Sequence, residues 1–254
     1  MFDLETVATI SGHFSIVGWV LAGVYQLYVS ALDGTADSFS PFFLVGYVVG
    51  DISNVVGCFW GSQMGFQKII SICSLVTDSL MALQFIYFRR KQSLQPRRSA
   101  ALLRPVAYAS MVAVSMASPL EPPSKIGGST QQLLIGQSFA WLAETFYVGA
   151  VVQQALKNYE KKSTGAVSRL LFIFDLFGSL STLLTIFVTS RTFGSTTESF
   201  DFLATELPYL VGAALCAAMD VVLLYQYRLY PCHLVVLDGY QTISVEPPTK
   251  YGSI

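Results

Sequence analysis

The chain has 254 residues, of which 53% are hydrophobic and only 12% are charged. Soluble domains carry about 25% charged residues, so this composition is typical of a membrane protein. A formal net charge of −1 argues against nucleic-acid binding, which requires a basic surface. The four cysteines have no metal-binding or redox spacing, and we find no hydrolase or phosphate-binding motif. We therefore expect no metal, no cofactor and no enzymatic activity.

Seven apolar runs have about the length that a helix needs to cross the hydrocarbon core of a bilayer. They lie at roughly 12–32, 41–60, 67–88, 102–119, 131–153, 168–190 and 207–227. The fourth run is short and rich in small residues, which favour close helix packing over lipid exposure. The sequence predicts an all-α membrane protein with seven transmembrane helices.

Basic residues gather in two of the short loops. The loop after the third run holds Arg89, Arg90, Lys91, Arg97, Arg98 and Arg104, and the loop after the fifth holds Lys157, Lys161 and Lys162. The N-terminus and the segment before the last run are acidic instead. Because basic loops remain in the cytosol, we expect the C-terminus to be cytosolic and the N-terminus to lie on the opposite side.

Spans one to three and spans five to seven contain matching residues at matching spacings. Gln26 and Gly50 correspond to Gln154 and Gly178, and Asp78 with Gln84 corresponds to Asp220 with Gln226. Both units begin on the same side, so the fourth span inverts the chain between them. Parallel repeats of this kind are a known transporter plan, with the site at their interface.

We divide the chain accordingly. Residues 1–88 form the first three-helix repeat, 89–130 a basic cytosolic loop and linker helix, 131–230 the second three-helix repeat, and 231–254 a cytosolic tail.

Five acids lie inside the predicted spans, with no lysine or arginine near their depth: Asp51, Asp78, Glu144, Asp175 and Asp220. Buried carboxylates face a bundle interior or a water-filled cavity. A cavity lined by acids attracts a cation, and its carboxylates can take up protons from an acidic lumen and release them to the cytosol. We expect Asp51, with Asp78 or Asp220, to couple proton movement to a cationic substrate. In the alternative, these acids bond to nearby donors such as Asn54, Ser53 and Thr77 and lock helices together.

A structural role is also an alternative for the other candidate residues. For Asp78 and Asp220 a structural clasp is an equal alternative, and Asp175 and Glu144 are expected to be structural or to lie at the lipid edge. Gln26 and Gln154 suit either helix packing or a substrate carboxylate. Asn54 joins the same candidate pathway. Packing or hinge positions are Gly46, Gly50 and Gly178, and Pro208 is expected to begin the last span.

Four segments carry a family resemblance: "GYVVGDISNVVGC", "VTDSLMALQFIYF", "QQALKNYEKKSTGAVS" and "LPYLVGAALCAAMDVVLLYQY". Together they resemble the PQ-loop repeat family of the seven-helix kind, closest to its vacuolar and lysosomal cationic amino acid transporters. The resemblance implies two three-helix bundles joined by an inverting helix, with a cavity between them. It also implies export of basic amino acids from an acidic compartment.

Both motifs that give the family its name have lost their proline. The chain has Tyr25-Gln26 in the first copy and Gln153-Gln154 in the second. Proline kinks a helix and often serves as a hinge, so its loss leaves a non-transporting receptor or scaffold as the alternative function.

The tail contains "YQTI" from Tyr240 to Ile243 and ends in "YGSI" from Tyr251 to Ile254. Both resemble tyrosine-based signals that adaptors read in sorting to the vacuole or lysosome. We therefore expect a sorting adaptor as a partner, besides the substrate, protons and the lipid bilayer. The expected location is a vacuolar or lysosomal membrane, with the N-terminus in the lumen.

Overall fold

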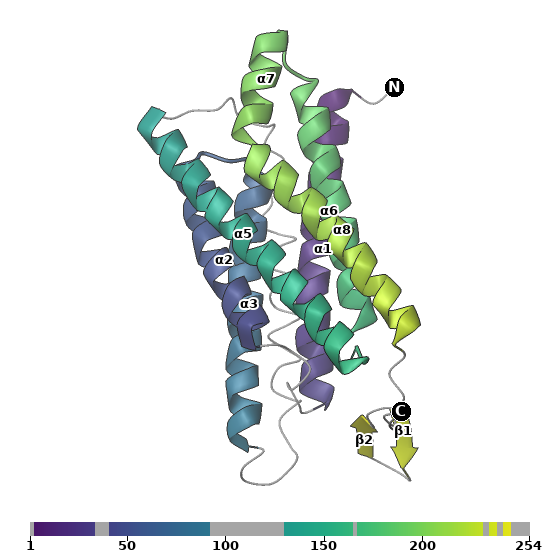
Figure 1. The fold of residues 1–254 in the computed structure, drawn as a ribbon. Coiled ribbons are helices and arrows are strands. Elements are labelled where there is room, and N and C mark those ends of the chain that lie inside the picture. Colours follow the sequence, from purple (N-terminus) through teal and green to yellow (C-terminus); the bar gives the residue numbers. More distant parts are fainter. Residues whose placement is uncertain are drawn as a thin grey trace, which may run out of the picture.

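The computed structural model describes residues 3–33, 41–91, 130–164, 167–230, 234–237 and 241–244. Its elements in chain order are α1 (Leu4–Asp33), α2 (Pro41–Trp60), α3 (Gly65–Lys91), α5 (Thr130–Lys161), α6 (Arg169–Ser190), α7 (Thr196–Thr205), α8 (Leu207–Leu229), β1 (Leu234–Leu237) and β2 (Gln241–Ser244). The two strands form a small antiparallel pair that follows α8 (Figure 1). The predicted all-α membrane class is confirmed.

Six long helices coincide with six of the seven predicted spans, and the predicted span at 102–119 lies outside the described residues. Five of the helices in the described ranges are long and apolar enough to cross a membrane: Leu4–Leu32, Phe43–Trp60, Gly65–Arg90, Arg169–Ser190 and Leu207–Leu229. α5 is longer still but is more polar, because it begins and ends in glutamines and charged residues. Large apolar side chains such as Val45, Leu83 and Val221 are exposed on the outside of the bundle, where lipid would contact them.

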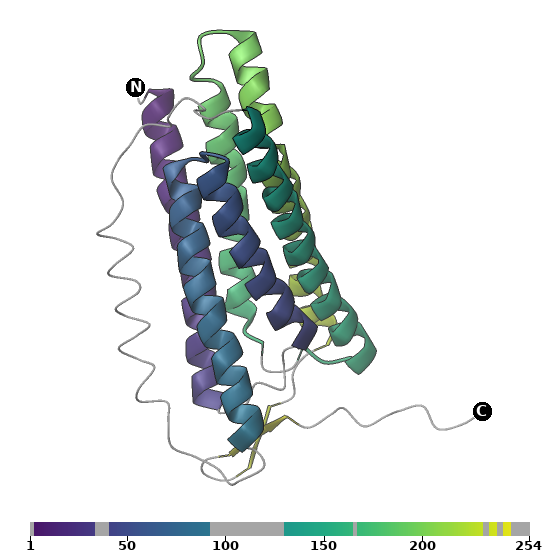
Figure 2. The ribbon, with the colours of Figure 1, turned by 90° about the vertical axis from the view of Figure 1, so that its left-hand side faces the viewer.

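The helices of the two halves pack across each other rather than only within each half. α1 packs chiefly against α6, and α2 packs chiefly against α5. α3 contacts both α1 and α2, while α8 contacts both α5 and α6. The contacts are symmetric when α1, α2 and α3 are matched with α5, α6 and α8, respectively. Each of these contacts then has its counterpart among the others, as expected for two parallel repeats. Figures 1 and 2 show these helices running side by side along one bundle axis.

Local sequence explains where several helices begin. The Asp3 carboxylate accepts a hydrogen bond of 2.7 Å from the Thr6 amide at the start of α1, and this bond holds the pKa of Asp3 below its usual value. Ser168 and Ser195 cap α6 and α7 in the same manner. Pro208 lies in the first turn of α8, where its missing N–H is not needed.

α7 was not predicted, because its ten residues contain no long apolar run. It follows α6 at the end of the bundle that carries the N-terminus (Figure 1). Phe202 is its buried side chain and packs into an apolar cluster with Cys58, Met64, Ile186 and Tyr209. This short helix therefore covers one end of the bundle.

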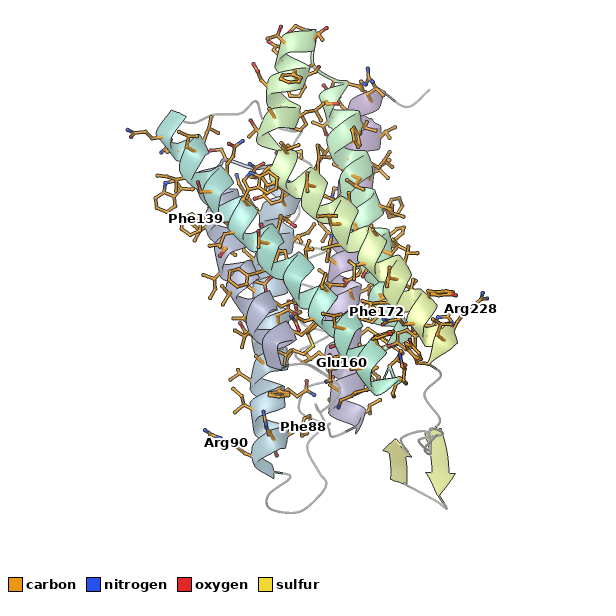
Figure 3. The ribbon with its side chains drawn as sticks, in the orientation of Figure 1. Phe88, Arg90, Phe139, Glu160, Phe172 and Arg228 are labelled. Carbon is orange, nitrogen blue, oxygen red and sulfur yellow. The ribbon has the colours of Figure 1, made fainter. Side chains whose placement is uncertain are left out.

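Charge is divided between the two ends of the bundle. Arg89, Arg90, Lys161 and Arg228 lie near the C-terminal ends of α3, α5 and α8, and Figure 3 shows Arg90 and Arg228 at the end away from α7. The acids Asp3, Glu5, Glu198 and Asp201 belong to the start of α1 and to α7, at the other end. This distribution supports the expected orientation, which stays a prediction.

Candidate functional site

A cavity of about 100 Å³ lies between the two halves and is lined by side chains from all six long helices. That volume holds more than one water molecule. All five acids predicted inside the membrane line it: Asp51, Asp78, Glu144, Asp175 and Asp220. Within the described ranges, no lysine, arginine or histidine lines the cavity. The arrangement is therefore a compact acidic chamber inside an apolar bundle.

Two apolar clusters close this chamber along the bundle axis. The larger one includes Leu27, Phe43, Met81, Phe172 and Leu223, and thus draws on both repeats. The smaller one surrounds Cys58 near α7. Along α2, Asp51 lies between Phe43 of one cluster and Cys58 of the other, so the acids occupy the gap between the two apolar layers.

Asp51 is fully buried. The Tyr147 hydroxyl of α5 donates a hydrogen bond of 2.7 Å to Asp51 Oδ1, while Oδ2 has no hydrogen-bond partner. The Asp78 carboxyl of α3 is a near neighbour that interacts with Asp51 electrostatically. The partner of Asp51 across the repeat interface is thus a tyrosine that the sequence analysis did not single out.

Two of the donors that the sequence suggested for a purely structural role, Ser53 and Thr77, are engaged elsewhere. Ser53 Oγ donates to the Val49 carbonyl at 2.9 Å, and Thr77 Oγ1 donates to the Cys73 carbonyl at 3.0 Å. Both bonds stay within their own helices. Asn54 lines the cavity, one turn from Asp51, and its Oδ1 accepts a bond from the Cys58 thiol.

In the second repeat the cavity aspartates are Asp175 of α6 and Asp220 of α8, both buried. The two carboxylates interact electrostatically, and Asp175 also interacts with Asp78. Asp220 Oδ2 has no hydrogen-bond partner, so it is open to a ligand in the cavity. The four aspartates therefore form a continuous series across the interface.

The expectation that Asp175 and Glu144 lie at the lipid edge is wrong. Asp175 is buried and Glu144 is half-buried, and both line the cavity. A Cβ atom added at Gly212 of α8 would overlap the Glu144 carboxylate, so Glu144 packs directly against the facing helix. The repeat pairing could have placed Asp175 at the cavity. Asp175 corresponds to Tyr47 of the first repeat, which lies one helical turn before Asp51 and so on the same face of its helix.

Two glycines allow aromatic side chains to reach the cavity from the opposite repeat. A Cβ added at Gly50 would lie 2.7 Å from Tyr147 Cε1, and one added at Gly178 would lie 3.0 Å from Trp19 Cδ1. Gly50 and Gly178 are repeat-related, and so are Tyr147 and Trp19, both of which line the cavity. Gly46 approaches Ala150 in the same way. A hinge role for these glycines stays a prediction.

Gln26 and Gln154 do not belong to the cavity lining of the described chain. Gln26 is fully buried; it accepts a hydrogen bond of 2.8 Å from the Ser168 amide at the start of α6 and donates to Ser30. Gln154 donates to Asn158 at 3.0 Å. These contacts favour helix packing over substrate contact.

A second glutamine in each repeat makes a symmetric bond. Gln84 of α3 donates to the Leu27 carbonyl of α1 at 3.4 Å, and Gln226 of α8 donates to the Ala155 carbonyl of α5 at 3.0 Å. Each acceptor directly follows Gln26 or Gln154. The matched Asp and Gln positions thus divide: the aspartates line the cavity and the glutamines join helices within a repeat.

The residues expected to act in sorting mostly fall outside this description. Tyr240, Tyr251 and Ile254 lie outside the described residues, and Ile243 belongs to strand β2. Their role stays a prediction. In the described ranges, no group of histidine, cysteine, aspartate or glutamate has the arrangement of a metal site.

Taken together, the fold and the cavity define a helical membrane protein with a polar chamber between two matched halves. The PQ loop repeat profile matches residues 135–195. The chain therefore contains a PQ-loop repeat, and it is homologous to vacuolar and lysosomal amino acid transporters.

Three relatives define this homology. The vacuolar arginine/histidine antiporter YPQ2 of Saccharomyces cerevisiae is 27% identical over 87% of this chain and 84% of its own length. The lysosomal amino acid transporter 1 homolog of Gallus gallus is 24% identical over 86% of this chain and 79% of its own. The vacuolar lysine transporter YPQ1 of Saccharomyces cerevisiae is 22% identical over 89% of this chain and 94% of its own.

Proposed function

We propose that this chain is a secondary transporter that exports cationic amino acids such as arginine, lysine and histidine from an acidic vacuole or lysosome, coupled to protons. The observation that carries the proposal is the chamber between the repeats, where five carboxylates and no base of the described chain form the wall. Such a wall attracts cations and repels anions. The relatives named as arginine/histidine and lysine transporters align over most of the chain.

The chamber suits both charged ends of a basic amino acid. The Asp175 and Asp220 carboxylates face the cavity and match a guanidinium or ammonium group, which forms its strongest hydrogen bonds with carboxylates. The substrate carboxylate needs donors, and the Trp19 indole N–H at the wall is one candidate. It donates a long bond of 3.4 Å to Thr182 Oγ1, which binding of a carboxylate would replace. Asp220 Oδ2 is buried without a hydrogen-bond partner, as is Asp51 Oδ2, so a cation at Asp220 would satisfy an unpaired oxygen.

Asp51 and Asp78 are the proposed proton carriers. Two neighbouring buried carboxyl groups that interact electrostatically are better satisfied by one proton than by two charges. The Tyr147 hydroxyl fixes the orientation of Asp51 from the other repeat. Relative movement of the repeats would therefore change the surroundings of this pair, which is how proton release could follow substrate movement.

The proposed setting is the membrane of an acidic organelle. The N-terminus and α7 would face the lumen, and the basic ends of α3, α5 and α8 would face the cytosol. The tyrosine motifs at 240–243 and 251–254 would then lie on the cytosolic side, within reach of a sorting adaptor.

One observation favours the alternative of a receptor that does not transport. α1 and α5 are continuous helices through Tyr25-Gln26 and Gln153-Gln154, where family members have a proline. Without proline these helices can keep the backbone hydrogen bond that a proline would remove, so neither contains a proline kink at this position.

The test is uptake of labelled arginine into proteoliposomes of the purified chain, with and without an imposed pH gradient. Citrulline, which has the shape of arginine without its charge, is the matched competitor. We expect gradient-dependent uptake that lysine and histidine inhibit and citrulline does not. Arginine binding without uptake would support the receptor instead, and equal competition by citrulline would contradict selection by charge.

A further inference from the structure

Another buried acid, Glu206, lies outside the cavity lining. Glu206 directly follows Thr205, the last residue of α7, and precedes α8, at the end of the bundle that carries the N-terminus (Figure 1). Only 2% of its surface is exposed. An acid at the end of a helix would ordinarily extend into water, so its burial requires partners.

Those partners come from the first repeat. Gln67, in the first turn of α3, donates a hydrogen bond of 2.7 Å to Glu206 Oε2. The Gln67 oxygen is itself held by the Met64 amide at 2.9 Å. Gln63, in the turn between α2 and α3, faces the same carboxyl and donates to it when its amide nitrogen is turned toward Glu206. Glu206 thus joins the α2–α3 turn to the α7–α8 junction.

A second contact spans the same gap one turn further in. The Cys58 thiol of α2 lies 3.3 Å from the Tyr209 hydroxyl of α8, within the apolar cluster that also contains Met64 and Phe202. Gln67 and Tyr209 both line the acidic cavity. The clasp between Glu206 and the two glutamines therefore closes the cavity on this side, and separating its partners would uncover Cys58.

The second repeat holds its own half of the clasp in place. Gln137 of α5 donates to the Ala204 carbonyl at 3.2 Å, at the end of α7. α7, Glu206 and α8 consequently move with α5, while Gln63 and Gln67 move with α2 and α3. Any rocking of one repeat against the other must break or form the Glu206 clasp.

We propose that Glu206, with Gln63 and Gln67, is a lumen-facing gate between the repeats that closes when Glu206 takes up a proton. The idea rests on the proposed function only in treating the cavity as a pathway. The role of Glu206 differs from that of the cavity acids. Glu206 would bind a proton to close the pathway, whereas the cavity acids would bind one to neutralise the site.

The direction of the pH effect follows from burial. Burial raises the pKa of Glu206 to about 7, partly offset by the Gln67 hydrogen bond, whereas an exposed glutamate has a pKa of about 4.3. The closed state therefore holds the proton more tightly than the open state, so protonation favours closure and ionisation favours opening. The titratable groups that face Glu206 are the Cys58 thiol, the Tyr209 hydroxyl and, beyond Tyr209, Glu144.

Gln63 can serve both protonation states of Glu206. A protonated carboxyl donates its O–H to the Gln63 oxygen, and an ionised carboxylate accepts from the Gln63 nitrogen after the amide turns. Closure in an acidic lumen would trap substrate in the chamber before release to the cytosol. No ion pair holds Glu206 within the described residues, so its own proton decides its charge.

Natural cysteines allow a test on the intact chain. The rate of N-ethylmaleimide labelling at Cys58 reports opening, and half-buried Cys73 of α3 is an internal standard. The reactive thiolate fraction rises with pH by the same factor at both sites well below a thiol pKa, so the ratio of the two rates removes this common rise. The charge of an ionised Glu206 disfavours the nearby Cys58 thiolate and by itself lowers the ratio, so an increase of the ratio with pH reports opening. Site-resolved mass spectrometry measures this ratio at pH 5.5 and pH 7.5 without requiring transport.

We expect the Cys58/Cys73 rate ratio of the unmodified chain to rise on the order of tenfold from pH 5.5 to pH 7.5, as two different pKa values for closed and open states require. Glu206→Gln, which is neutral at both pH values, should remain closed and show a constant ratio. Glu198→Gln, at an exposed acid of α7, is the matched control and should keep the unmodified response.

Gln67→Ala provides a second arm that leaves the acid intact. It removes the 2.7 Å donor and should raise the ratio at pH 5.5 severalfold. A pH-independent ratio in the unmodified chain, or an unchanged pH response in a folded Glu206→Gln variant, would overturn the proposal. Either result would leave the arginine uptake experiment unaffected, so the two proposals fail separately.

Discussion

The two repeats share a scaffold but differ in the chemistry that they place at its centre. Each has a glycine that admits an aromatic ring from the other repeat, at Gly50 and Gly178. Each has a glutamine that bonds the neighbouring helix, and an aspartate on its third helix. At the position after the glycine, however, the first repeat has Asp51 and the second has Ser179.

The helix contacts are thus symmetric between the repeats, but the polar groups at the cavity are not. Matched close contacts would let the repeats rock against each other about a common axis. Unmatched polar groups make the two sides of the cavity different: Asp51 has Tyr147 and Asp78 beside it, while Asp175 stands one turn earlier on α6 beside Asp220. In the function proposed above, the first side carries the proton and the second binds the cationic side chain.

Substitution of Asp51, the acid that the second repeat lacks, gives the largest expected effect on uptake. Asp51→Asn keeps the shape of the side chain but removes its charge and its ability to release a proton. We expect gradient-driven arginine uptake to fall on the order of a hundredfold, as loss of a buried charged partner implies. Ser179→Ala, at the matched position where the hydroxyl is buried without a partner, should change uptake less than about twofold.

The matched control for charge is Asp201→Asn on α7, where the side chain is exposed. Its uptake should equal that of the unmodified chain. Equal losses for Asp51→Asn and Ser179→Ala would show that the two repeats are functionally equivalent, against the division of tasks.

The glycines test whether the shared scaffold tolerates added volume. A Cβ at Gly178 would also lie 3.1 Å from the Trp19 backbone nitrogen, which cannot turn aside. We expect Gly178→Ala to lower thermal stability, by about 1–3 kcal/mol in unfolding free energy. At Gly50 the obstacle is the Tyr147 ring, which can swing away at the cost of its bond to Asp51, so Gly50→Ala should lower uptake on the order of tenfold.

Gly149→Ala on α5 is the control for these substitutions, because nothing lies within 4 Å of its added Cβ. It should be neutral or stabilising by up to about 1 kcal/mol, since alanine favours helix over glycine. Stability is measured by the thermal midpoint in detergent. Gly178→Ala as stable as Gly149→Ala would show that α1 and α6 are not tightly packed there.

The glutamine pair should show the smallest and most equal effects. Gln84→Ala and Gln226→Ala each remove one bond to a backbone carbonyl within a repeat. We expect each to lower stability by about 1 kcal/mol without changing the pH dependence of uptake. A loss confined to one of the two variants would mean that the repeats are not equivalent even as scaffolds.

Much of the fold is readable from the sequence, because length and apolarity of a membrane helix are set by the bilayer. The α2 helix occupies the predicted 41–60, whereas the packing of α1 against α6 and of α2 against α5 was not predicted. α7 could not be predicted in this way, since it spans no membrane and owes its place to Phe202 packing against the bundle end.

The site was predicted less completely. Asp51, Asp78, Asp220 and Asn54 do line one cavity, because acids in a bundle must avoid lipid. Gln26 instead holds the start of α6, and the bond of Gln154 lies within α5. Tyr147 and Glu206 were not proposed as site residues, and Asp175 was expected in a structural role or at the lipid edge, because these roles depend on which face of another helix meets them. Single-helix periodicity does not contain that information.

The most direct test of the division of tasks is proton movement during arginine entry. Proteoliposomes loaded with a pH-sensitive dye and given arginine without an imposed gradient should show a proton flux that accompanies uptake. We predict this flux for the unmodified chain and for Ser179→Ala, and its loss in Asp51→Asn while arginine still binds. Arginine-driven proton flux of unchanged size in Asp51→Asn would contradict a proton-carrying role for Asp51.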